Sequence, residues 1–224
     1  MNTITLTNPL FKLKNMFKRK PIEEIPQVVR HASNRVEPLQ TDFASTKELF
    51  QYAKMRCLNA LHSNEPYEHA IVADTQKNKI IAEYIGDRNS CSLEDLAFLE
   101  LDKEHTIIFH GHLKELPLSS TDLKTLINSN TFCNVAFNPK GEFSLAYKTK
   151  DFQTNASKEK FKEYALKSAE ETYDIRNNIS AYGEMLDYLL RIDAKSMGLK
   201  YVSNYNAFAK NKKAYETYIN SHKN

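Results

Sequence analysis

The stretch IIFHGHLKELPLSSTDLKTLI carries side chains whose types and spacing could surround one metal ion. His110 and His112 are separated by a single residue at the end of an apolar run, and Ser119 and Asp122 follow. On a strand, residues i and i+2 point to the same face, so both imidazoles can reach one point in space. Asp122 falls in the first turn of the helix predicted next. Two imidazoles and one carboxylate would give a metal three protein ligands.

Three protein ligands and an open fourth position are typical of a catalytic zinc site, whereas a structural zinc site has four. Zinc bound there lowers the pKa of water to about 7 and so makes hydroxide available at neutral pH. The reaction also needs a base, and Glu83 is the residue we expect in that role. It lies in the predicted strand Lys79–Ile85, where a buried carboxylate is costly unless it has a partner.

Each part of this pattern also has a purely structural interpretation. Ser-x-x-Asp before an apolar helix is a common capping box, His-x-His occurs by chance, and a strand glutamate can face solvent at a sheet edge. The joint order favours a metal site, because each residue falls on the type of element that the chemistry requires. The other histidines, His69 among them, are expected at the surface.

An α/β domain at residues 41–150 would position these residues. Apolar periodicity and turn residues predict the element order α-β-β-α-β-α-β-β. The predicted elements are, in order, Ser45–His62, Ala70–Asp74, Lys79–Ile85, Ser92–Leu99, Thr106–His110, Ser119–Ile127, Asn134–Phe137 and Phe143–Tyr147.

The two flanking regions differ from this domain in composition. Residues 1–40 are basic and rich in proline, which predicts a flexible N-terminal segment. Residues 151–224 are predicted to form a helical C-terminal extension, in which apolar residues at steps of three and four predict one continuous helix from Ser157 to about Met197. Gly198 is the expected stop, and a last helix is predicted at Asn204–Ile219. We expect the extension to pack on the core, with binding of a partner or self-association as the alternative.

The bulk composition limits the classes of protein. The chain has 224 residues, of which 41% are hydrophobic and 26% charged, as in ordinary globular proteins. Its three widely spaced cysteines favour reduced thiols, and the N-terminus lacks the pattern of a secretory signal, so we expect a cytoplasmic protein. No apolar run approaches the roughly 18 residues of a transmembrane segment. A formal net charge of +3 is too small to predict nucleic-acid binding by itself.

The residues discussed above resemble the JAMM signature of the JAB/MPN metallopeptidases. That resemblance implies that His110, His112 and Asp122 bind Zn²⁺ and that Glu83 is the general acid/base. It also implies that Ser119 stabilises the oxyanion formed in amide hydrolysis. The expected fold is a cytidine-deaminase-like α/β core of three layers, followed by the helical extension.

The resemblance covers about residues 66–148 and is strongest to bacterial and phage-associated JAB-like domains and to the RadC-like branch. Two positions depart from the family pattern. Gly111 stands where the family usually has Ser, Thr or Asn, and Leu113 stands where it has Pro. The spacer between the second histidine and the serine is also one residue shorter than usual. These differences concern substrate fit more than metal binding, because all three ligand types are present.

Two classes of function follow. The first is a zinc-dependent metallopeptidase that hydrolyses a peptide or isopeptide bond in a protein or peptide substrate. The alternative is a JAB- or RadC-like module that binds protein or nucleic acid without hydrolysis, with the basic N-terminus or the lysine-rich segment Lys210–Lys213 contacting phosphates. A deaminase is disfavoured, because the Pro-Cys-x-x-Cys helix of that class is missing.

Overall fold

The computed structural model describes residues 35–93, 95–114, 116–175 and 179–205. In these ranges the chain forms a mixed seven-stranded sheet with the order β1-β3-β2-β4-β5-β6-β7. The β4–β5 pair is parallel and all the others are antiparallel. The strands are β1 Arg35–Val36, β2 His69–Asp74, β3 Lys79–Ile85, β4 Thr106–Gly111, β5 Cys133–Phe137, β6 Phe143–Lys148 and β7 Leu199–Ser203.

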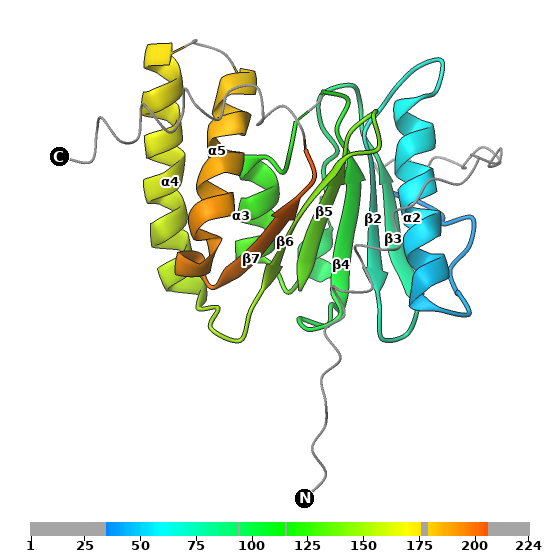
Figure 1. Ribbon diagram of the computed structural model, residues 1–224. Helices are drawn as coiled ribbons and strands as arrows, with labels where there is room; N and C mark the ends of the chain where they lie inside the picture. The colour runs from blue at the N-terminus through cyan, green and yellow to red at the C-terminus, as the bar shows by residue number, and fades with distance from the viewer. Residues whose placement is uncertain (1–34, 94, 115, 176–178, 206–224) are drawn as a thin grey trace, which may run out of the picture.

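Helices cover both faces of this sheet, giving three layers (Figure 1). The described helices are α2 Thr46–Leu61, α3 Ser120–Asn128, α4 Thr154–Ile175 and α5 Ile179–Asp193, with short 3-10 turns η1 Leu96–Phe98 and η2 Ala194–Met197. On one face α2 packs on β4, where the rings of Phe50 and Phe109 contact edge to face with their centroids 4.8 Å apart. On the other face α3, α4 and α5 share a buried apolar cluster with β5 and β6. The expectation of a mixed α/β fold is therefore confirmed.

Two predicted elements differ from the structure. The predicted helix Ser92–Leu99 is only the 3-10 turn η1, in which Leu96 is the one buried residue. The predicted helix from Ser157 to Met197 is two helices, α4 and α5. These run antiparallel, because the Ser157 hydroxyl in the first turn of α4 donates to the carbonyl oxygen of Met197, just after α5 ends, and Tyr164 in the middle of α4 contacts Asp193 at the end of α5. A helical hairpin lets both helices bury their apolar sides on the same core, which one straight helix could not do.

The C-terminal region also completes the sheet. Gly198 ends η2 with a positive φ of 64°, as expected of a helix stop. The next residues form β7 beside β6, a strand that the sequence analysis missed. The extension thus packs on the core, and the described part of it adds a strand as well as helices. The last predicted helix lies outside the described residues from position 206 onward, and residues 1–34 lie outside them too.

None of the helices in the described ranges combines the length and apolar character needed to cross a bilayer.

Candidate metal centre

The two histidines lie together where β4 ends. His110 is 6% and His112 9% exposed, and their Nε2 atoms are 3.0 Å apart. The Nδ1 atom of His112 lies 3.3 Å from the carbonyl oxygen of Leu116. An Nδ1–H that donates to this oxygen leaves the lone pair of Nε2 facing His110, which is the tautomer that a metal ligand requires. The same-face prediction for the two imidazoles is confirmed.

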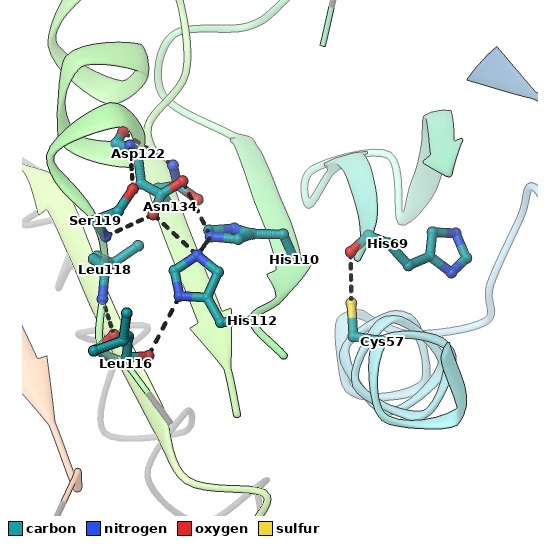
Figure 2. Close-up of polar contacts among 10 residues, drawn as sticks. Cys57, His69, His110, His112, Leu116, Leu118, Ser119, Asp122 and Asn134 are labelled. Carbon is teal, nitrogen blue, oxygen red and sulfur yellow. Dashed lines mark hydrogen bonds and ion pairs between the residues drawn. The ribbon is translucent and has the colours of Figure 1, made fainter. Parts of the chain in front are cut away.

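Asp122 approaches both imidazoles from the first turn of α3 (Figure 2). Its Oδ1 atom is 3.2 Å from Nε2 of His110, and its Oδ2 atom is 3.2 Å from Nε2 of His112. A capping box fixes this orientation, because the Ser119 amide donates to Oδ2 at 2.7 Å and the Ser119 hydroxyl accepts from the Asp122 amide at 3.2 Å. The Leu118 amide, which donates to Ser144 Oγ at 2.7 Å, anchors the helix start to β6.

The geometry of these three residues fits a metal ion. A tetrahedral zinc with ligand distances of about 2.0–2.1 Å places neighbouring ligand atoms about 3.3 Å apart. The Nε2 atoms of His110 and His112 are 3.0 Å apart, and each lies 3.2 Å from a different one of the two Asp122 carboxylate oxygens, which are distances close to this value. His110, His112 and Asp122 therefore form a group that could hold a metal ion.

The electrostatics of this group also favour a cation. Burial raises the pKa of Asp122, but the neighbouring imidazoles outweigh burial and hold that pKa well below its usual value. Burial lowers the pKa of His112, but the charge and hydrogen bond of Asp122 outweigh it and raise the pKa to about 9. A site that keeps its carboxylate ionised and its imidazole protonated stabilises positive charge, which a metal ion would supply instead of protons.

His110, His112 and Asp122 open into a cavity of about 640 Å³. Pockets of this size hold small ligands or short chain segments. Its walls are largely apolar, and Ser119 lies on its lining beside the three ligands. The apolar residues that line it are Ala70, Leu93, Leu96, Ile108, Leu116, Pro117 and Leu186.

Glu83 does not lie at this site, which corrects its assignment as the base. In the sheet register Ala70 pairs with both Tyr84 and His110, whereas Ile71 pairs with both Glu83 and Phe109. Side chains alternate between faces along a strand, so Glu83 and His110 point to opposite faces. The carboxylate of Glu83 lies under α2, with the sheet between it and the metal ligands.

Glu83 belongs to a buried polar network instead. Its Oε2 atom is 3.1 Å from both Arg56 Nη2 and His69 Nε2, and its Oε1 atom accepts from the Tyr52 hydroxyl at 3.2 Å. Glu83 and His69 are both 0% exposed, so the expectation that His69 lies at the surface was wrong. Burial raises the pKa of Glu83, but His69 and Arg56 outweigh burial and lower that pKa below its usual value. The buried carboxylate of Glu83 is therefore stabilised by Tyr52 and Arg56 of α2 and by His69 of β2, and not by a metal site.

The network predicts a loss of stability in acid. Burial lowers the pKa of His69 below 6.5, so the unfolded chain takes up a proton that the folded protein refuses. Stability from this residue is present above pH 6.5 and is lost as the pH falls below it. The pKa of His112 is raised, so the contribution of that residue to the free energy of unfolding increases as the pH falls. Between pH 7.5 and 5.5, urea unfolding should therefore show a smaller fall in the free energy of unfolding for His69→Gln than for the wild type. Equal slopes would contradict this assignment.

Glu68 is the carboxylate that the structure places beside His110, His112 and Asp122. It directly precedes β2, lines the cavity, and interacts electrostatically with His110, His112 and Asp122. Burial raises the pKa of its side chain. It lies two positions before Ala70, the cross-strand partner of His110, so both lie on the side of the sheet that carries His110 and His112.

Sequence reasoning missed Glu68, although one signal pointed to it. Glu68 is the first residue of the sequence EHAIVAD, and the alternation of side chains along a strand points it to the same face as Ala70, whereas His69 and Ile71 point to the other face. Which of these two faces carries His110 and His112 depends on the register between β2 and β4, and a single sequence does not reveal that register.

Gly111, between the two histidines, lies where α2 packs against β4. It points to the side of the sheet opposite the histidines, and a Cβ atom there would lie 3.0 Å from Cγ of Leu61 in α2. Glycine thus allows α2 to approach β4 closely at this point. A larger residue would require Leu61 to move.

Comparisons of the chain with family models, with curated proteins and with solved structures find no match. A function for the chain must therefore be inferred from the geometry of the site.

Proposed function

We propose that this protein is a zinc-dependent metallopeptidase of the JAMM type, acting on a peptide or isopeptide bond in a protein or peptide substrate. The observation that carries the proposal is the convergence of His110, His112 and Asp122, with Glu68 beside them, in one cavity. Two imidazoles and one carboxylate are a ligand set suited to catalytic zinc. The fold proposed is the JAB/MPN core, and a cytoplasmic location is proposed with it.

When bound, zinc supplies a Lewis acid that polarises the substrate carbonyl and lowers the pKa of water. The two histidines and Asp122 hold the ion, and the capping box keeps Asp122 in place. Glu68 takes the proton from the attacking water and passes it to the leaving amine. This role replaces the one expected for Glu83.

Ser119 retains its proposed role at the oxyanion. Its hydroxyl oxygen already accepts a hydrogen bond from the Asp122 amide, and its own proton remains available to donate. It lies on the cavity lining beside the metal ligands. A donor in such a place stabilises the developing negative charge, and loss of a comparable donor costs about 100- to 1,000-fold in turnover.

The alternative of a non-hydrolytic binding module has less support. Its phosphate contacts would come from the basic N-terminus, which lies outside the described residues. A scaffold also gains nothing from two imidazoles and two carboxylates gathered in one cavity.

Metal removal tests the proposal. Dialysis against a zinc chelator should abolish hydrolysis of a peptide mixture derived from casein, and stoichiometric zinc should restore it, because the proposed mechanism activates water and polarises the carbonyl through zinc. Cleavage would be followed by mass spectrometry, with calcium and magnesium as control ions. Hydrolysis that survives complete removal of zinc would overturn the proposal.

A further inference from the structure

Two basic side chains line the cavity from the loops on either side of it. Arg88 belongs to the segment between β3 and η1, and Lys114 to the segment between β4 and α3. Both are exposed. The metal ligands and Glu68 line the same cavity.

The backbone fixes the loop of Arg88 against the site. The Glu68 amide donates to the Asp87 carbonyl and the Gly86 amide donates to the Glu68 carbonyl, both at 2.8 Å. The Asp87 carboxylate is turned into its own loop, where it accepts the amides of Asn89 and Ser90 at 2.7 and 2.9 Å. Asp87 is therefore already engaged within its own turn.

Neither cation is paired within the part of the chain that the structure describes. Arg88 and Lys114 make no ion pair or side-chain hydrogen bond with a described residue, although many other charged side chains of this protein do. Glu68 and Asp122, the carboxylates on the cavity lining, offset the charge of one divalent ion. With that ion bound, the formal charge left over among the described residues of the lining is that of Arg88 and Lys114. Such a cavity attracts an anion.

We propose that the substrate carries a carboxylate near the scissile amide and that Arg88 and Lys114 bind it. This inference rests on the proposed function and narrows its substrate class. The carboxylate is either an acidic side chain or the free C-terminus of a chain, since both present the same group. Apolar side chains of the substrate would lie against the leucines of the cavity wall, such as Leu93 and Leu116.

Binding tests this proposal without turnover. Zinc-loaded Glu68→Gln protein would be titrated calorimetrically with acetylated peptides that differ only in charge. One arm exchanges glutamine for glutamate at each internal position in turn, with an amidated C-terminus. The other arm keeps glutamine and frees the C-terminal carboxylate. We expect one arm to bind roughly three- to tenfold more tightly than the neutral amide, as exposed ion pairs allow. The preference should weaken as sodium chloride is raised.

A second set of variants assigns the preference to the two cations. Adding Arg88→Gln and Lys114→Gln should remove the preference and leave binding of the neutral peptide unchanged. The matched control adds Lys103→Gln and Lys150→Gln, which change the net charge equally at exposed positions outside the cavity lining. A preference that survives loss of Arg88 and Lys114, or no preference in either arm, would overturn the proposal.

Turnover of the same peptides by the zinc-loaded wild type separates the two proposals. Cleavage of neutral and acidic peptides at equal kcat/KM would retain the peptidase and overturn the carboxylate preference. Tighter binding of the acidic peptides with no cleavage of any peptide would retain the anion site and count against the peptidase.

Discussion

Replacing Glu68 by glutamine is expected to lower kcat by about 100- to 10,000-fold, which is the usual contribution of a general acid/base. Glutamine keeps the size of the side chain but cannot take a proton from water. The zinc content and the unfolding midpoint should stay near those of the wild type, because Glu68 is not among the three ligands that converge. Peptide cleavage and metal analysis on the same preparation would check this.

The control for that experiment is Glu83→Gln, assayed on its folded fraction. Because Glu83 lies on the far side of the sheet, its loss should leave the turnover of folded molecules nearly intact. If Glu68→Gln retained full activity while folded Glu83→Gln had none, the assignment of the base would be reversed.

Loss of Glu83 is instead expected to lower the free energy of unfolding by about 3–5 kcal/mol. Glu83→Gln removes the counter-charge of Arg56, which is 5% exposed and would then be a buried cation without a paired anion. Chemical denaturation by urea measures this difference.

A double substitution shows that the lost stability comes from the charge on Arg56. Exchanging Arg56 for methionine in the Glu83→Gln background should recover a large part of the stability, since no charge then remains buried. If Glu83→Gln unfolded at the wild-type urea concentration, Glu83 would not be the structural ion-pair partner that we describe.

The sequence alone predicted the parts of the site that depend on local geometry. His110 and His112 follow from the two-residue repeat of a strand, and the capping box of Ser119 and Asp122 follows from helix chemistry. Finding a group that could hold an ion needs no long-range information here, because His110, His112 and Asp122 come from one strand–loop–helix unit.

Predictions that needed strand pairing were less successful. Glu83 and Glu68 belong to a hairpin whose alternation is plain in the sequence, but the register with β4 decides which face meets the histidines. A buried carboxylate is costly wherever it lies, and for Glu83 the compensating partners are Arg56 and His69 on the far side. Burial cost alone therefore could not distinguish an ion pair from a catalytic site.

The C-terminal region shows the same limit. Steps of three and four identified helical structure but did not predict that it forms two helices, α4 and α5, since both contribute to one apolar pattern. The strand β7 is short, and it exists because β6 offers it a free edge. Tertiary packing, not local propensity, determines both features.

Metal analysis of the purified chain is the most direct test of the central claim. After equilibration with micromolar zinc and removal of the excess, the wild type and His105→Ala, which lies outside the group of three ligands, should each retain one zinc per chain. His110→Ala and Asp122→Ala should each retain far less, because each removes one of three ligands. Equal zinc in the wild type and both ligand variants, or no zinc in any of them, would contradict the metal centre described here.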